Sequence, residues 1–290
     1  MTQQAEMSSI DASPIRNISD TALWVAVYRA RETERADALF RDPFARRLAG
    51  ERGEAIAKSM QFSERNAWSY VSRTLRVDQI VTARVNEGAD MVINLAAGLD
   101  ARPYRMELPP SLQWVEVDLP AVIDYKEEIL REEKPCCSLQ RIRLDLSNIA
   151  ARRKLFHELS AYAKKLVVIT EGLLIYLTRE EVLALGSDLA AQANFADWVV
   201  ELVSPGLLKM LNKNLAAVQQ AGSSFKFAPS EGPRFFTACG WKPVEVYSLL
   251  KTPAIRKRLP RIGRLAALLP ALNGRQGNRI WGAICRVTRI

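Results

Sequence analysis

Short apolar runs alternate with amphipathic stretches through the middle of the chain, and most of the runs end at a turn or an acidic residue. The runs predict five strands, at Met91–Leu95, Gln113–Val117, Leu139–Leu144, Leu166–Ile169 and Trp198–Val203. Between them, helical periodicity predicts helices over Ala121–Glu133, Ile149–Lys164 and Arg179–Asn194. Alternation of this kind is typical of a parallel sheet with helices on both faces.

The two ends of the chain depart from this alternation. Helices predicted over Asp20–Arg31 and Glu64–Val85 precede the first strand and suggest a cap, and Pro43 opens a further helix between them. Near the other end, strands are predicted over Trp241–Tyr247 and Arg279–Val287 without the usual helical crossover between them. We therefore predict an α/β fold with a doubly wound, mostly parallel sheet of seven strands, the last of them antiparallel.

The expected domain organisation follows from these elements. A polar tail over residues 1–16 precedes a single domain over 17–290, and a hydrophobic content of 48% is ample for its core. Its expected parts are a helical cap (17–88), a cofactor-binding core (89–203), a cap insertion (204–240) and strands six and seven around a basic insertion (241–290).

The charge balance is basic, with 41 basic and 32 acidic residues, and this could favour nucleic acid, anionic lipid or an anionic substrate. The excess is concentrated between Lys251 and Arg279, which hold eight basic residues and no acid. No nucleic-acid partner is expected, because these cations are not interleaved with aromatic residues. Over 249–270 aliphatic residues alternate with cations as in a membrane-surface helix, but three prolines interrupt the run and favour a lid or surface subdomain.

Other features narrow the chemistry. No apolar run can span a bilayer and the N-terminal residues do not form a secretory signal, so a cytoplasmic protein is expected. The four cysteines lack a Cys-x-x-Cys pair, which favours free thiols over a disulfide framework or a metal site. The one histidine, His157, lies in a charged helical stretch, so we expect chemistry that needs no imidazole.

The stretch Val92–Asp100 is the most informative in the chain. An apolar strand ends there in Ala-Ala-Gly, and Gly98 allows a ligand to approach the backbone closely. Acids follow the first four strands, at Asp100, Asp118, Asp145 and Glu171. Because ligands of such sheets lie beyond the carboxyl ends of the strands, we expect these acids to share one rim. An NAD-binding domain is an alternative, but the Gly-x-Gly-x-x-Gly spacing is absent.

Six motifs follow one another along the chain: Asp42–Ala45, Ser72–Thr74 with Asp78, Asn94–Arg105, Glu116–Pro120, Asp145–Leu146 and Glu171–Leu177. In this order they resemble the leucine carboxyl methyltransferase family, and especially its bacterial small-molecule or polyketide-type O-methyltransferases. The resemblance implies a Rossmann-like class I methyltransferase fold, with S-adenosylmethionine as cofactor and S-adenosylhomocysteine as product. Ala96 departs from the glycine that many members carry, which alanine can replace if its φ is negative.

The resemblance also implies which residues bind the cofactor. They are Arg73, Ala96, Gly98, Asp118, Leu119, Asp145, Leu146 and Glu171. Arg73 would hold the methionine carboxylate, Asp118 the ribose hydroxyls, and Asp145 the adenine amino group. Glu171 would lie near the sulfonium. The alternatives are a helix-surface role for Arg73 and plain helix N-caps for Asp118 and Asp145.

On the acceptor side, Tyr176 and Tyr28 are the candidate catalytic residues, with Arg29 as a further substrate contact. Arg102 and Arg105 could steer an anionic substrate or form exposed ion pairs with nearby acids. The expected reaction is methyl transfer to a carboxylate or hydroxyl of a small or medium-sized acceptor, anionic or phenolic. It would proceed by in-line displacement with little general base catalysis.

Several functional alternatives stay open at this point. One is a methyltransferase acting on tRNA or on a protein carboxyl group, since the basic balance and the resemblance both allow it. Others are an NAD-dependent oxidoreductase and a non-catalytic nucleotide-binding protein. The residues do not specify the acceptor or the oligomeric state.

Overall fold

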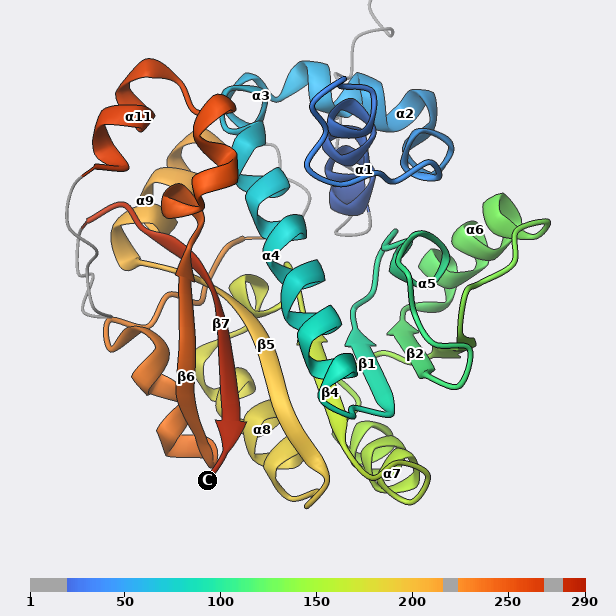
Figure 1. Ribbon diagram of the computed structural model, residues 1–290. Coiled ribbons are helices and arrows are strands. Elements are labelled where there is room, and N and C mark those ends of the chain that lie inside the picture. The colour runs from blue at the N-terminus through green and yellow to red at the C-terminus, as the bar shows by residue number, and fades with distance from the viewer. Residues whose placement is uncertain (1–19, 216–223, 269–278) are drawn as a thin grey trace, which may run out of the picture.

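The computed structural model describes residues 20–215, 224–268 and 279–290, and a seven-stranded sheet lies at its centre (Figure 1). The strands are β1 (Met91–Leu95), β2 (Gln113–Asp118), β3 (Ser138–Arg143), β4 (Leu166–Thr170), β5 (Phe195–Val203), β6 (Trp241–Ser248) and β7 (Gly282–Arg289). Their spatial order is β3-β2-β1-β4-β5-β7-β6. The first five pair in parallel, whereas β7 pairs antiparallel with both β5 and β6. The predicted fold is therefore confirmed.

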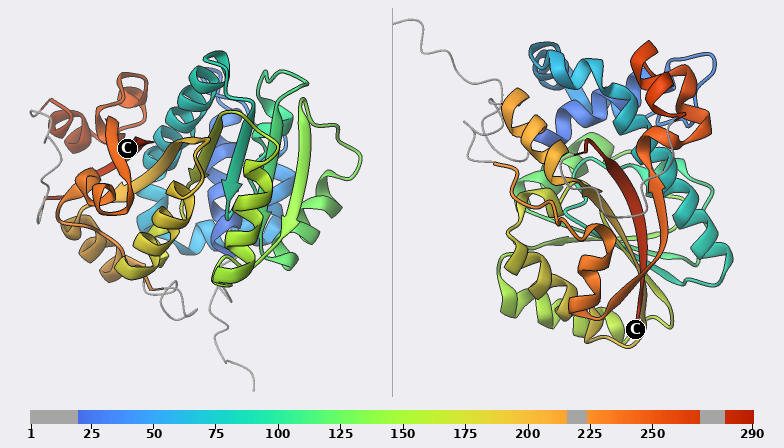
Figure 2. Two further views of the ribbon diagram at one scale, coloured as in Figure 1. Left: turned by 90° about the horizontal axis from the view of Figure 1, so that it is seen from below. Right: turned by 90° about the vertical axis from the view of Figure 1, so that its left-hand side faces the viewer.

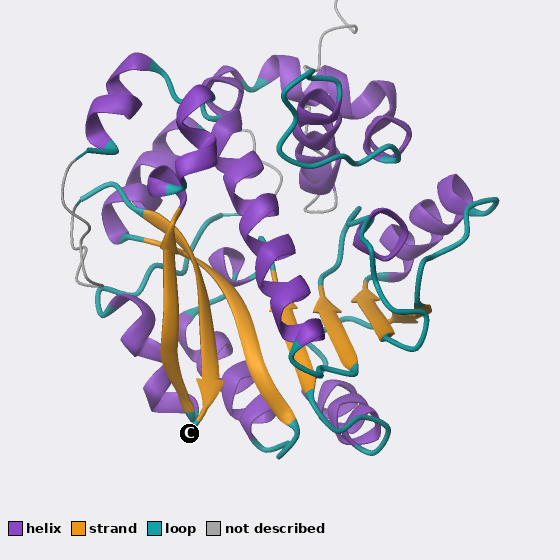
Figure 3. Cartoon of the chain, viewed as in Figure 1, coloured by secondary structure: helices purple, strands orange, loops and turns teal. Residues whose placement is uncertain are grey.

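The α-helices are α1 (Asp20–Thr33), α2 (Ala45–Ser59), α3 (Gln61–Arg65), α4 (Ala67–Asn86), α5 (Arg102–Arg105), α6 (Pro120–Leu130), α7 (Ile149–Ser160), α8 (Arg179–Ala190), α9 (Pro205–Asn214) and α11 (Arg261–Ala266) (Figure 3). The 3-10 helices are η1 (Leu174–Tyr176), η2 (Gly232–Cys239), η3 (Leu249–Lys251) and η4 (Pro253–Lys257). The helix predicted over Glu64–Val85 is divided at Asn66, whose backbone (φ −110°, ψ 16°) is not helical.

Helices cover both faces of the sheet, as the views in Figure 2 show. Successive strand residues point to opposite faces. In β1, Ile93 belongs to a core cluster with Phe156 of α7 and Leu185 of α8, whereas Val92 belongs to a cluster with Ile80 of α4. Strands that are buried at every position, such as β1 and β4, therefore have two covered faces, which is the arrangement that parallel pairing requires.

A third apolar cluster builds the cap over the carboxyl ends of the parallel strands, where α1, α2 and α3 lie (Figure 1). It joins Trp24 of α1 and Leu48 of α2 to Leu99 after β1 and to Phe225, which follows α9. The predicted tail over residues 1–16 lies outside the described residues. Within the described ranges, no helix combines the length and the apolar character needed to cross a membrane.

Candidate active site

A cavity of about 1790 Å³ lies at the carboxyl ends of the parallel strands, lined by the cap as well as by the sheet. All eight predicted cofactor-binding residues line it, together with the acceptor-side candidate Tyr176: Arg73, Ala96, Gly98, Asp118, Leu119, Asp145, Leu146, Glu171 and Tyr176. All four acids predicted to share a rim also line it, including Asp100. The topology thus brings together residues that are separated by up to about a hundred positions in the chain.

The turn after β1 approaches the cavity with its backbone. Ala96 and Gly98 have φ values of 53° and 50°, in the left-handed region. The condition of a negative φ at Ala96 is therefore not met, and alanine keeps the turn in the left-handed region. The amide of Ala97 donates to the carbonyl of Val117 (3.3 Å) and that of Gly98 to Asp118 Oδ2 (2.6 Å), so bonds to β2 hold the turn in place. A side chain on Gly98 would meet Ala22 at 3.3 Å.

Asp118 is held at the end of β2 by two backbone amides. Its carboxylate accepts from Gly98 N (2.6 Å) and from Leu119 N (2.7 Å). Burial raises the pKa of Asp118, and these two amides oppose the shift. The side chain does not cap α6, whose N-cap position is Leu119. The N-cap alternative therefore fails, and the remaining carboxylate lone pairs can accept hydroxyl groups from the cavity.

Asp145 lies at the same rim, after β3. Its carboxylate accepts from Ser147 N (2.9 Å), whereas the N-cap of α7 is Asn148, whose side chain accepts from Ala151 N (3.1 Å). The N-cap alternative fails here as well. Asp145 and Leu146 thus place a hydrogen-bond acceptor and an apolar side chain next to each other along the cavity.

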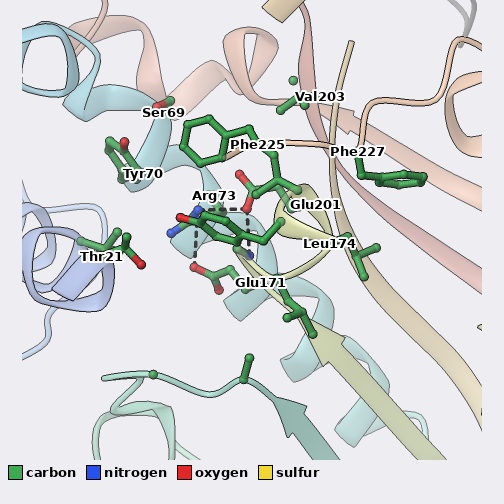
Figure 4. Close-up of a pocket in the computed structure, with 18 of the residues that line it drawn as sticks. Thr21, Ser69, Tyr70, Arg73, Glu171, Leu174, Glu201, Val203, Phe225 and Phe227 are labelled. Atoms are coloured by element: carbon green, nitrogen blue, oxygen red, sulfur yellow. Dashed lines mark hydrogen bonds and ion pairs between the residues drawn. The ribbon is translucent and has the colours of Figure 1, made fainter. Parts of the chain in front are cut away.

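Arg73 lies between two carboxylates at the centre of the cavity wall (Figure 4). Its Nη1 donates to Glu201 Oε2 (2.9 Å), and its Nε lies 2.9 Å from Glu171 Oε1. The amide of Gly172 also donates to Glu201 Oε2 (3.0 Å). Arg73 is only 8% exposed, so the helix-surface alternative is wrong.

Glu201 is a site residue that the sequence analysis missed. It lies in β5 among apolar neighbours, in a strand predicted from its apolar run. Burial raises the pKa of Glu201, although the nearby Arg73 opposes this. An acid within a buried apolar strand is costly unless it is paired, and that cost is the signal that could have identified it.

Arg73 and Glu201 are one end of a continuous ion-pair network. Its members are Arg29, Asp42, Arg105, Asp78, Arg102, Asp100, Glu171, Arg73 and Glu201. With four arginines and five acids, the network has a net charge of −1 when all are ionised. It connects the cap, where Arg29 lies in α1, to the sheet.

Arg102 and Arg105 are inside this network, which corrects the expectation of exposed pairing. The side chains of both are 3% exposed. Arg102 contacts Asp78 (2.6 Å), Asp100 (2.5 Å) and Glu171 (2.9 Å). Burial alone would raise the pKa of Asp78 and Asp100, but the neighbouring guanidinium groups hold both below the ordinary value. These arginines are therefore committed to the fold and not free to steer a substrate.

The two tyrosine candidates differ in position. Tyr176 lines the cavity beside Phe225, with ring centroids 5.3 Å apart, and burial raises its pKa to about 12. Tyr28 does not line the cavity but is buried and stacked on Tyr70 at 4.9 Å. The cavity-facing side of α1 carries Val25 and Arg29 instead. Tyr28 is therefore not supported as a substrate contact.

The part of the cavity beyond Arg73 is mostly apolar. Its walls include Trp24, Phe62, Tyr70, Met210, Leu211 and Phe225, from the cap and from the region around α9. Within the described ranges, no cluster of three or more histidine, cysteine or acidic side chains could hold a metal ion.

Comparisons with known proteins relate the whole chain to methyltransferases. A candidate S-adenosyl-L-methionine-dependent methyltransferase of Streptomyces avermitilis is 29% identical over 275 residues, covering 90% of this chain and 93% of that protein. One of Frankia alni is 29% identical over 283 residues, covering 93% and 94%.

Solved structures share the fold. A candidate methyltransferase from Thermobifida fusca matches with a TM-score of 0.58 at 16% identity, covering 99% of both chains. A DUF574 family protein from Streptomyces avermitilis has the same TM-score at 11% identity, covering 91% of this chain and 97% of that one. The profile of the leucine carboxyl methyltransferase family matches residues 22–190, more than half of the sequence. The chain therefore belongs to the leucine carboxyl methyltransferase family and is an S-adenosylmethionine-dependent methyltransferase.

Proposed function

We propose that this enzyme methylates a hydroxyl group, phenolic or aliphatic, on an apolar acceptor of small or medium size. The observation that carries the proposal is the acidic end of the ion-pair network, where Glu201 lines the cavity beside Arg73.

The residues at the rim fit S-adenosylmethionine. Asp118 offers a carboxylate to the ribose hydroxyls beside a turn in which Gly98 has no side chain, and Asp145 and Leu146 offer an acceptor and an apolar surface to adenine. Arg73 attracts the methionine carboxylate, and the adjacent Glu171 favours a cation. When bound, S-adenosylmethionine supplies a methyl group that its sulfonium activates for displacement.

Charge favours a neutral acceptor. The network has a net charge of −1, and the donor has one net positive charge, so the two together are neutral. A carboxylate acceptor would add an uncompensated negative charge next to Glu171 and Glu201, whose side chains are only 13% and 19% exposed, so that repulsion is strong. A hydroxyl adds none.

Glu201 can also accept the proton that a hydroxyl must lose. The hydrogen bonds from Arg73 and Gly172 are both accepted by Oε2 of Glu201 and not by Oε1. The raised pKa of Glu201 makes it a stronger base than an ordinary carboxylate. Tyr176, with a pKa of about 12, stays neutral and can donate a hydrogen bond. This assignment adds a general base to the mechanism expected from the sequence.

The cavity walls favour an acceptor with an apolar body. Aromatic and aliphatic side chains of α1, α9 and the residues around Phe225 surround the space beyond Arg73. Burial of apolar area would supply binding energy of about 25 cal/mol per Å². A free peptide chain would have to leave many backbone polar groups unpaired against such walls.

Carboxyl methylation is a second candidate, because the matching family is described by that reaction. The two candidates differ in the product: a methyl ester is hydrolysed by mild alkali, whereas a methyl ether is not. Incubation with radiolabelled S-adenosylmethionine and a small-molecule extract, followed by alkali, distinguishes them without prior identification of the acceptor. We expect the label to remain in the product; release as volatile methanol would favour the carboxyl candidate.

Two variants separate donor binding from acceptor chemistry. Asp118→Ala should abolish calorimetric binding of S-adenosylhomocysteine, because it removes the carboxylate at the ribose position. Glu201→Gln should bind S-adenosylhomocysteine within about tenfold of the wild type, while methyl transfer falls by about a hundredfold or more. Transfer by Glu201→Gln at the wild-type rate would refute the base assignment.

A further inference from the structure

The basic segment, here residues 249–268, is attached firmly to the cap along one side. Ile255 and Leu259 are buried and pack against Val71 of α4. Arg258 forms ion pairs with Glu32 (2.7 Å) and Asp37 (2.8 Å). These contacts fix the inner side of the segment to the cap, and they thereby also fix which residues form its outer side.

The outer side carries large aliphatic residues in solvent. Ile262, Leu265 and Leu268 are 81%, 68% and 68% exposed. Ile262 and Leu265 lie in α11 and Leu268 in the turn that follows it. Because they are three positions apart, their side chains share one side of this helical segment. Single exposed aliphatic residues are ordinary, but a group of three on a short protruding element marks an interaction site.

Exposed cations surround this apolar face. Arg256, Lys257, Arg261 and Arg264 are all exposed in and before α11. The sequence contains no acidic residue after Glu245. The segment therefore combines exposed apolar side chains with exposed positive charge, which is the composition of segments that lie in the interface of an anionic bilayer.

We propose that Ile262, Leu265 and Leu268, with the surrounding cations, form a docking surface for an anionic lipid bilayer. The aliphatic side chains would enter the headgroup boundary and the arginines would contact lipid phosphates. Ala266 of α11 lines the cavity together with Leu250 and Lys251. A docked bilayer would thus lie against the wall of the cavity, a position suited to an apolar ligand that partitions into membranes.

The prolines that argued against a membrane helix have a different role in the structure. Pro253 begins η4, and Pro260 is the N-cap residue of α11. They break the segment into two short turns, which allows Ile255 and Leu259 to face the core while Ile262 and Leu265 face solvent. The surface is therefore a short protrusion rather than a long amphipathic helix.

Sedimentation of the full chain with vesicles tests this proposal. The vesicles contain either phosphatidylcholine alone or a mixture with about a third phosphatidylglycerol, the anionic component. We expect binding to the anionic vesicles only, and at least about tenfold weaker partitioning for Ile262→Ser/Leu265→Ser/Leu268→Ser. Arg261→Gln/Arg264→Gln should weaken binding as well. The matched control is Tyr162→Ser, since Tyr162 is 73% exposed and follows α7 at the opposite end of the sheet (Figure 1).

Three results would overturn the proposal. One is absence of binding to anionic vesicles. Another is equal binding of the triple variant and the wild type, which would reduce the contact to charge alone. The third is a dimer in light scattering that the triple variant abolishes, without vesicle binding, because the face would then belong to a second copy of the chain.

Discussion

Removal of the Arg102 guanidinium by Arg102→Met tests how far the ion-pair network supports the fold. Methionine keeps an unbranched side chain that replaces the aliphatic part of arginine, but it is shorter and carries no charge. The substitution leaves Asp78, Asp100 and Glu171 with one cation fewer, in a place where the arginine side chain is 3% exposed. Breaking a buried ion pair costs about 3–5 kcal/mol.

The free energies lost with the three contacts of Arg102 do not add, because each acid keeps other partners. Asp78 keeps Arg105 at 2.7 Å and Glu171 keeps Arg73 at 2.9 Å. Asp100 loses its guanidinium partner but keeps hydrogen bonds from Asn94 Nδ2 and from the amide of residue 102, both at 2.8 Å. We therefore expect a loss of about 3–5 kcal/mol in the free energy of unfolding at pH 7, the cost of one broken pair rather than three.

The loss should depend on pH. In the wild type the pKa values of Asp78 and Asp100 are lowered, so their stabilising contribution is present above the ordinary pKa and is lost as pH falls below it. In the variant, the effect of burial on the pKa of Asp100 is opposed only by Lys126, Arg105 and the remaining hydrogen bonds, and we expect burial to raise that pKa above its ordinary value. The variant then gains stability relative to the wild type as pH falls, and the difference should shrink between pH 7 and pH 5.

Urea unfolding followed by tryptophan fluorescence, at both pH values, measures this difference. Arg143→Met is the control, because Arg143 pairs with Asp124 and Glu127 on the exposed surface and its loss should change stability little. Arg102→Lys, which keeps the charge, serves if the methionine variant does not fold. A loss below about 1 kcal/mol, or one independent of pH, would refute the reasoning.

Two further predictions follow from local features. Ala96→Gly should raise the free energy of unfolding by about 1 kcal/mol, because an alanine with φ 53° is strained, and the same urea experiment would contradict this if stability fell. In thiol titration with a disulfide reagent, one cysteine should react in the native state and all four after unfolding. Cys136 is exposed, whereas burial raises the pKa of Cys137 and Cys239 to about 11 and that of Cys285 further. A second fast thiol would contradict the described packing.

The features that the sequence predicts well are local or periodic. A run of five residues of which four are apolar, such as Met91–Leu95, is typical of a buried strand. Acids that follow such runs meet at one rim in a parallel sheet. Asp118 and Asp145 could therefore be placed without knowledge of any long-range contact.

The features that the sequence does not predict depend on distant partners. Arg73 and Glu201 are 128 positions apart, and nothing near either residue identifies the other. The positive φ of Ala96 follows from hydrogen bonds to β2, which outweigh the local preference of alanine. Tyr28 could not be distinguished from Arg29 because both lie in a helix whose apolar side is wide.

The position of β7 has a consequence for biosynthesis. Among the strands that the structure describes, β6 pairs with β7 alone, although β7 follows it in the chain. During translation, β5 and β6 therefore emerge with unpaired edges that cannot be closed until residues 282–289 leave the ribosome. A nascent chain stalled before that point exposes two strand edges, which are sites of aggregation. Completion of the sheet thus depends on the segment that is synthesised last among its strands.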